Sequence, residues 1–293
     1  MRILGRFWRT AIDAYWQFED DDGWAVASHI ALSTLMAMFP FLIVLTALAG
    51  FIGSKELADE IAKLMLETWP KEVAGPIARE VHNVMTTARG DVLTIGAALA
   101  VFFASSGIES LRIGLNRAYD SIETRNWLWL RLESIAYVLV AAAALIALAF
   151  LIVLAPLIFA TARRFAPWLD QIEALFTFVR FAIATIVLVI ALFVVHKWLP
   201  AGRRRFAQIA PGILATLVLW LASGAVFGRY LAEFAYTYVT YYAGLASAMI
   251  ALVFLYLTAS IFLYGGQINS VIAKSRTGAD DAKPGSVAAT PEG

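Results

Sequence analysis

The chain has 293 residues and no cysteine, so it offers neither disulfides nor thiolate metal ligands. Hydrophobic residues make up 61% of it and charged residues 15%, whereas soluble domains carry roughly a quarter charged residues. The net charge of +1 lacks the concentrated basic face of a nucleic-acid-binding protein, so we expect no nucleic-acid partner.

The first 23 residues predict an amphipathic helix that lies in the cytoplasmic interface of a membrane. Apolar and aromatic residues recur at helical spacing, at Leu4, Phe7, Trp8, Ala11, Ile12 and Tyr15. Arginines occupy other faces, where they are attracted to anionic lipid head groups. Three aspartates and Gly23 end the segment.

Six long apolar stretches follow, and a membrane-spanning helix needs about 20 such residues. They predict spans over residues 27–51, 92–113, 135–160, 175–198, 207–230 and 243–268. Because hydrocarbon offers the backbone no hydrogen-bond partners, each stretch must be helical. We therefore expect an all-α fold with one six-helix transmembrane domain over residues 24–273.

The gap between the first two spans has helical periodicity interrupted by prolines, which predicts two amphipathic helices in the first periplasmic loop. Residues 274–293 are rich in Gly, Ala, Asp, Pro and Ser and predict a disordered cytoplasmic tail. In the fifth span, Gly224 and Gly228 have the spacing that lets another helix approach closely.

Lysines and arginines are distributed unequally between the two sides of the predicted bundle. Fourteen of the 23 lie in the N-terminal segment, the second and fourth gaps and the tail, and seven lie in the other gaps. Cytoplasmic segments carry the excess of these residues, so both termini are predicted to be cytoplasmic.

Pro40 lies in the middle of the first predicted span. Proline kinks a transmembrane helix and frees a carbonyl group that neighbouring helices must satisfy. Pro40 is therefore a candidate hinge, and a plain packing kink is the alternative.

The second span ends in the densest polar cluster of the chain. Glu109 and Arg112 are three residues apart and share a helix face, which Asn116 extends. With Arg117 and Arg125 they form a candidate site for an anion or a lipid head group, because arginine binds phosphate and carboxylate through two parallel hydrogen bonds. The alternative is an interfacial salt bridge that fixes the depth of the helix.

Signatures of enzymes are missing from the sequence. It contains no glycine-rich phosphate loop, zinc-protease histidine pair or nucleophile elbow. Its three histidines are scattered, and without cysteine they cannot build a zinc site. We therefore expect no catalytic residues, no metal and no cofactor.

Three stretches resemble the YihY/BrkB-type bacterial inner-membrane proteins. They are Asp22-Gly23 with Met38–Phe41, Ser105–Gly107 through Leu115–Tyr119 to Arg125, and Pro211-Gly212 with Tyr242–Ala246 and Gly265–Asn269. The resemblance covers nearly all of residues 1–273 and implies six helices in a bacterial inner membrane. One departure is Gln267, where the family is expected to carry a glutamate. Members have been labelled ribonuclease BN, an activity in tRNA 3′ processing, but the chain lacks the clustered ligands of a metal-dependent nuclease.

These observations predict a membrane protein that transports or handles a lipid or an amphiphilic anion. In this hypothesis Arg112 contacts the anion, Glu109 holds Arg112, and Asn116 adds a hydrogen bond. Membrane lipids are the expected partners, together with an anionic small molecule or head group, and the oligomeric state is open. A scaffold or envelope-integrity protein without transport is the alternative, and the ribonuclease is the least favoured hypothesis.

Overall fold

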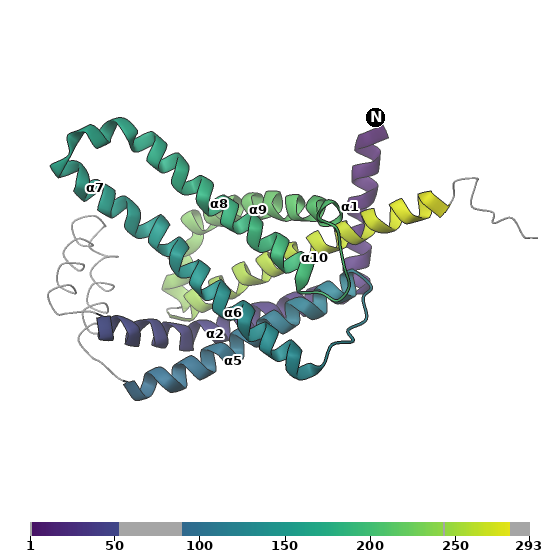
Figure 1. Ribbon diagram of the computed structural model, residues 1–293, viewed down its shortest axis with the longest axis horizontal. Helices are drawn as coiled ribbons and strands as arrows, with labels where there is room; N and C mark the ends of the chain where they lie inside the picture. Colours follow the sequence, from purple (N-terminus) through teal and green to yellow (C-terminus); the bar gives the residue numbers. More distant parts are fainter. Residues whose placement is uncertain (1, 53–89, 243, 282–293) are drawn as a thin grey trace, which may run out of the picture. The chain divides into compact units, whose positions relative to one another are not determined.

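The computed structural model describes residues 2–52, 90–242 and 244–281. Regular structure in these ranges is entirely helical, which confirms the all-α class for the described part of the chain (Figure 1). Two compact units divide the chain, one of residues 1–31 with 108–293 and the other of residues 32–107.

The helices vary widely in length. In chain order they are α1 (Arg2–Asp20), α2 (Gly23–Ile52), α5 (Gly90–Ala118), α6 (Trp127–Ala149), the π-helical η1 (Phe150–Leu154), α7 (Ala155–Phe165), the 3-10 helix η2 (Pro167–Ile172), α8 (Glu173–Trp198), α9 (Phe206–Tyr242) and α10 (Gly244–Asp281).

Five stretches of the described residues are long and apolar enough to cross a membrane. They are Thr94–Ala118, Trp127–Ile152, Trp168–Trp198, Phe206–Glu233 and Ala248–Ser275. Helix α2 adds a shorter apolar stretch, Gly23–Met38. Five of the six predicted spans thus have a counterpart of membrane-crossing length, and the count of six stays a prediction. The predicted helices of the first loop fall on residues 53–89, outside the described residues.

Helix α1 has two faces of opposite exposure. Ala14 and Phe18 are buried, whereas four large side chains are exposed, namely Trp8, Ile12, Tyr15 and Trp16. Its inner face packs on α10, where the Tyr264 hydroxyl donates to the Ala11 carbonyl oxygen at 2.8 Å. The chain therefore forms the amphipathic helix, while its place in a membrane interface stays a prediction.

Helices α9 and α10 approach each other at two glycines. A Cβ atom on Gly212 would collide with the carbonyl oxygen of Gly265, so the two backbones are nearly in contact. The Gly212 N–H donates to Asn269 Oδ1 at 2.6 Å. At Gly224 and Gly228 no described atom lies within 4 Å of an added Cβ. The close approach predicted at that pair is thus not found among the described residues, and it occurs about three to four turns nearer the start of α9.

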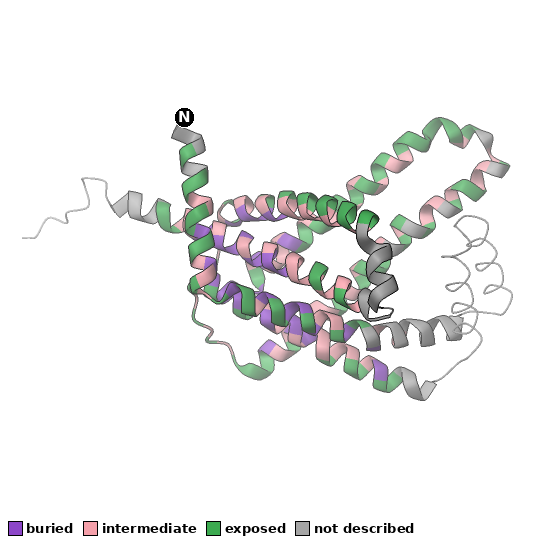
Figure 2. Ribbon diagram, turned by 180° about the vertical axis from the view of Figure 1, so that it is seen from behind, coloured by how far each residue is buried: buried purple, intermediate pink, exposed green. Residues whose placement is uncertain are grey.

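Helices α6, α7 and α8 form a long hairpin with mostly exposed apolar side chains (Figures 1 and 2). The π-helical turn η1 precedes Pro156, which stands in the first turn of α7. Proline has no N–H and clashes with the carbonyl group four residues earlier, and a wider helical turn relieves that clash. Outward-facing apolar residues are what a helix in contact with lipid requires.

The last helix is longer than predicted. Helix α10 ends at Asp281, whereas the sequence placed the start of a disordered tail at residue 274. Residues 274–281 carry no proline, and Gly278 weakens a helix without breaking it, so the helix continues past residue 273. The rest of that tail, residues 282–293, lies outside the described residues.

Within the second unit, Pro40 is a buried residue inside α2. The structure keeps this segment helical on both sides of the proline. A hinge role for Pro40 stays a prediction.

Candidate functional site

The predicted polar cluster begins on the last turns of α5 and continues into the connection to α6. Asp120 has a positive φ of 53°, which ends α5 and turns the chain. The Asn126 side chain accepts a hydrogen bond from the Leu128 N–H at 2.8 Å and caps the start of α6. The end of α5, the connection and the start of α6 therefore lie beside one another.

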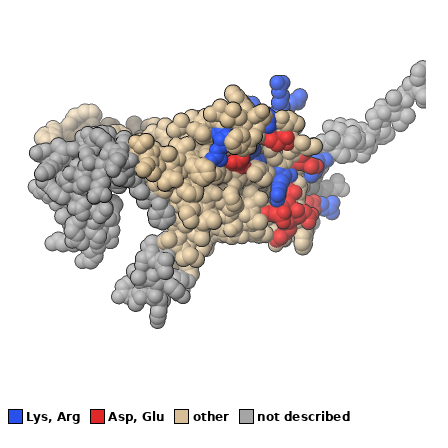
Figure 3. Space-filling view, turned by 90° about the horizontal axis from the view of Figure 1, so that it is seen from below, with Lys and Arg blue, Asp and Glu red and all other residues tan. Residues whose placement is uncertain are grey.

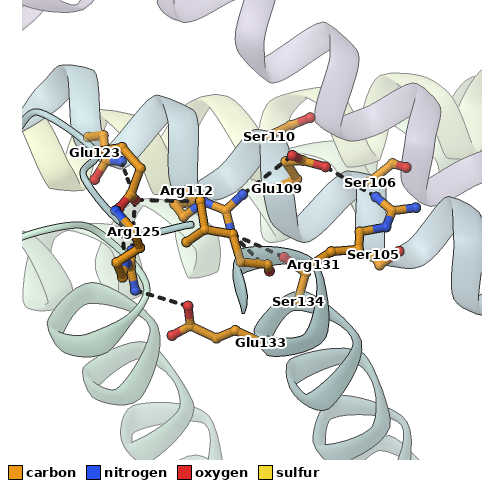
Figure 4. Close-up of polar contacts among 12 residues, drawn as sticks. Ser105, Ser106, Glu109, Ser110, Arg112, Glu123, Arg125, Arg131, Glu133 and Ser134 are labelled. Carbon is orange, nitrogen blue, oxygen red and sulfur yellow. Dashed lines mark hydrogen bonds and ion pairs between the residues drawn. The ribbon is translucent and has the colours of Figure 1, made fainter. Parts of the chain in front are cut away.

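Arg112 is buried, with only 4% of its side chain exposed. Its guanidinium lies 3.4 Å from a Glu109 oxygen and 4.0 Å from a Glu123 oxygen. It also donates to the Leu130 carbonyl oxygen at 3.3 Å and to the Ser134 hydroxyl at 3.2 Å (Figure 4). The side chain predicted to bind an anion therefore already has carboxylate, carbonyl and hydroxyl partners.

Glu123 and Arg125 form the tightest ion pair of the cluster. The Arg125 Nε and a terminal nitrogen donate to the two Glu123 carboxylate oxygens at 2.9 and 2.8 Å. These side-chain hydrogen bonds lower the pKa of Glu123 from 4.5 to about 2 and raise the pKa of Arg125. Arg125 also pairs with Glu133 of α6 at 2.9 Å. Glu123 thus remains a carboxylate at any physiological pH.

Arg131 of α6 completes the cluster by pairing with Glu109 at 3.1 Å. We call the connected residues the arginine–glutamate network, which comprises Glu109, Arg112, Glu123, Arg125, Arg131 and Glu133. Three arginines face three glutamates, so the network carries no net charge. On the face shown in Figure 3, acidic and basic side chains lie close together toward one end. Such pairing lowers the cost of holding charges at the end of an apolar bundle.

Two of the predicted residues also hold the connection between α8 and α9. Asn116 Oδ1 accepts a hydrogen bond from the Ala201 N–H at 2.7 Å. Arg125 donates to the Leu199 carbonyl oxygen at 2.9 Å. Residues 199–205, which we call the 199–205 connection, are therefore held by Asn116 at the end of α5 and by Arg125, a member of the network.

Arg117 departs from the predicted constellation. It donates to the Asp21 carbonyl oxygen at 3.1 Å and to Asp22 Oδ2 at 3.3 Å, next to the turn between α1 and α2. The structure thus brings together Glu109, Arg112, Asn116 and Arg125 and turns Arg117 away from them. Binding of a ligand by any of these residues stays a prediction.

Sequence reasoning missed the acidic and basic partners from α6. Arg131 and Glu133 fall within the first two turns of a helix that begins at Trp127, eight residues before the predicted span. The Asn126 capping signal followed by charges and aromatic residues could have placed that start. Among the described residues, no group of three or more His, Asp or Glu side chains stands close enough to hold a metal ion.

A protein-family model described as virulence factor BrkB matches residues 14–290. The chain belongs to the BrkB family. The resemblance seen in the sequence is therefore confirmed, and the chain is an integral membrane protein of the YihY/BrkB type.

Of two related proteins, one is named for an enzyme activity and the other for its place in a membrane. The ribonuclease-like protein YfkH of Bacillus subtilis is 22% identical over 255 residues, which cover 87% of this chain and 92% of that protein. A UPF0761 membrane protein of Coxiella burnetii is 27% identical over 270 residues, covering 88% and 91% of the two chains. No solved structure matches this BrkB-family chain.

Proposed function

We propose that this protein handles the head group of an anionic lipid, or another amphiphilic anion, at the cytoplasmic face of a bacterial inner membrane. It crosses that membrane six times, with α2 as the first span and both termini in the cytoplasm. The excess of lysine and arginine in the N-terminal segment, the second and fourth gaps and the tail supports this orientation.

The exposed aromatic face of α1 is the observation that carries the proposal. Trp8 and Trp16 are 68% and 61% exposed, although both are large apolar side chains. With Ile12, Tyr15 and Tyr264 they line an open apolar groove. Aromatic side chains with one apolar and one polar end favour the boundary between lipid tails and head groups. A helix held there by α10 brings the charged end of the first unit to the level of the head groups.

In this function the arginine–glutamate network has one of two roles. If Arg112 binds the anion, the ligand must displace a glutamate, because the guanidinium is already paired. If the network is a structural frame, another cation contacts the ligand. If Arg112→Ala and Glu109→Ala each kept the stability and the lipid handling of the wild type, both residues would be removed from the proposal.

A scaffold without transport is the second candidate, and the neutrality of the network favours it. Six charges that satisfy one another hold helices in register without needing a ligand. In that case the exposed face of α1 would serve as a docking surface at the membrane.

Lipid binding and lipid movement separate the two candidates. The delipidated full chain is mixed with equal amounts of phosphatidylglycerol and phosphatidylcholine, and the retained lipid is identified by native mass spectrometry. Handling of an anionic lipid predicts preferential retention of phosphatidylglycerol, with movement of a fluorescent phosphatidylglycerol across proteoliposome membranes. Equal retention of both lipids without movement would leave the scaffold as the better candidate.

The name of the Bacillus subtilis relative raises the ribonuclease hypothesis. Cleavage of RNA by an activated water needs clustered metal ligands, and the described residues contain no such cluster. We expect the detergent-purified chain to leave a tRNA precursor uncut in the presence of Mg²⁺, Mn²⁺ or Zn²⁺. Cleavage that is lost on substitution of a residue in this chain would revive the hypothesis.

A further inference from the structure

Arg204 differs from the arginines of the network because no carboxylate of the described residues pairs with it. Arg112, Arg125 and Arg131 each face one or more glutamates. One terminal nitrogen of Arg204 is buried and makes no hydrogen bond to the described residues. Burial lowers the pKa of Arg204, as expected for a cation without a neutralising partner. Its guanidinium therefore has one terminal nitrogen without an acceptor, which a phosphate oxygen reaches by displacing the atoms that cover it.

The guanidinium of Arg204 is nevertheless held in one place. Its other terminal nitrogen donates to the Ser121 hydroxyl at 2.7 Å, and its central carbon lies 4.0 Å from the centre of the Tyr119 ring. The Tyr119 hydroxyl accepts a hydrogen bond from Asn269 of α10 at 3.1 Å, which fixes the ring. Burial raises the pKa of Tyr119 to about 12, so the phenol stays neutral. A cation oriented before binding loses less entropy when a ligand arrives.

The backbone around Arg204 is also fixed. Asn116 and Arg125 hold Ala201 and Leu199 through the hydrogen bonds described above. Gly202 has a φ of +90°, a conformation that side chains rarely adopt, and it lets the chain turn beside Arg204. Arg203 and Arg205 flank this position and are exposed. The 199–205 connection thus carries three consecutive arginines. Only the middle one, Arg204, is partly buried and held in one orientation.

We propose that Arg204, framed by Tyr119, Ser121 and the 199–205 connection, binds a phosphate group. This rests on the proposed handling of an anionic lipid and assigns the contacting residue to the 199–205 connection instead of Arg112. A guanidinium suits phosphate because its planar fork donates two parallel hydrogen bonds to two oxygens. The phosphate belongs either to a lipid head group or to a free phosphate ion.

The test compares Arg204→Gln with Arg203→Gln, which removes the same charge from the adjacent exposed residue. Each full-length chain in detergent is assayed for retention of phosphatidylglycerol by native mass spectrometry and for binding of inorganic phosphate by calorimetric titration. We expect Arg204→Gln to weaken binding roughly tenfold, as for loss of a hydrogen bond to a charged group. Arg203→Gln should remain within about twofold of the wild type, as for an exposed charge.

The two ligands separate the sources of the phosphate. If retention of phosphatidylglycerol depends on Arg204, the phosphate belongs to a lipid head group. If only the binding of inorganic phosphate depends on Arg204, the site is supported and the lipid function is contradicted. Phosphatidylglycerol retained equally by the wild type and Arg204→Gln overturns the site and leaves the lipid function standing. Equal losses in the two variants, or no binding of either ligand to the wild type, also overturn the site.

A second pair of variants covers the case in which Arg204→Gln does not fold. Arg204→Lys and Arg203→Lys keep the charge, and a thermal unfolding curve checks the fold of each. We expect Arg204→Lys to lose affinity severalfold because lysine lacks the planar fork, and Arg203→Lys to lose none. Equal affinities in these two variants would overturn the proposal.

Discussion

At the residue scale, Arg112 is the most buried side chain of the arginine–glutamate network. Its side chain is 4% exposed, so water cannot replace a lost glutamate or carbonyl group. A buried ion pair contributes little compared with well-packed apolar residues, but removal of one partner leaves the other uncompensated. The complete network therefore changes the free energy of unfolding little, whereas removal of one of its charges lowers that free energy strongly.

We expect Arg112→Ala to lower the free energy of unfolding by about 3–5 kcal/mol, as for a broken buried ion pair. Arg117→Ala is the control, because its ion pair with Asp22 is largely exposed and contributes about 0–1 kcal/mol. Unfolding of both variants is followed in mixed micelles by titration with a denaturing detergent. Similar midpoints for the two variants would contradict a structural role for Arg112.

Glu123 predicts a dependence of stability on acid pH. Its pKa is about 2 in the folded chain and 4.5 ordinarily, so its contribution is complete above about pH 4.5 and is lost as the pH falls toward 2. We expect Glu123→Gln to flatten the fall of the unfolding temperature across this range, measured by intrinsic fluorescence. Glu233→Gln removes an exposed carboxylate outside the network and should keep the wild-type profile. An unchanged profile in Glu123→Gln would show that its ion pair is unimportant.

At the scale of elements, the contact between α9 and α10 depends on the absence of two side chains. The Gly212 backbone lies against the Gly265 carbonyl group, and Thr216 occupies the space beside Gly265. Small residues permit this approach, and helix packing in a membrane relies on the van der Waals contacts it creates. The hydrogen bond between Asn269 and the Gly212 N–H joins the two helices at the same level.

We expect Gly212→Ala to destabilise the protein by about 1–3 kcal/mol, because the methyl group forces the two backbones apart. Gly228→Ala introduces the same methyl group where no described atom lies within 4 Å. That control should be neutral or slightly stabilising, since alanine favours a helix over glycine by about 0.5–1 kcal/mol. Thermal unfolding in detergent measures both changes, and equal losses would place the sensitive contact elsewhere.

The helices could be predicted from sequence because their apolar composition and length leave few other structures in hydrocarbon. Of the partners of Arg112, helical spacing predicted Glu109, but it could not predict Glu123 or Ser134. Glu123 reaches it only because Asp120 turns the chain in a positive-φ conformation, and Ser134 reaches it only because α6 begins at Trp127. Helical spacing relates residues on one helix, but it carries no information on which helix ends meet. The oriented position of Arg204 escaped prediction for the same reason.

At the scale of the whole molecule, the orientation in the membrane can be tested directly because the chain has no cysteine. Single cysteines at exposed Thr124 and Gln171 are expected on opposite sides of the membrane. A maleimide that cannot cross membranes should label Gln171→Cys in intact spheroplasts and Thr124→Cys only after permeabilisation. The cysteine-free wild type controls for background labelling, and the reverse pattern would invert the proposed orientation.

The contact between α1 and α10 also has a consequence for biosynthesis. The hydrogen bond from Tyr264 to Ala11 joins residues 253 positions apart. Ribosomes add about 5–20 residues per second, so α1 emerges roughly 10–50 s before its partner helix exists. During that interval the face of α1 that packs on α10 lacks that partner, although Phe18 can already contact Trp24 at the start of α2. Assembly of this end of the protein therefore waits for the last helix to be inserted.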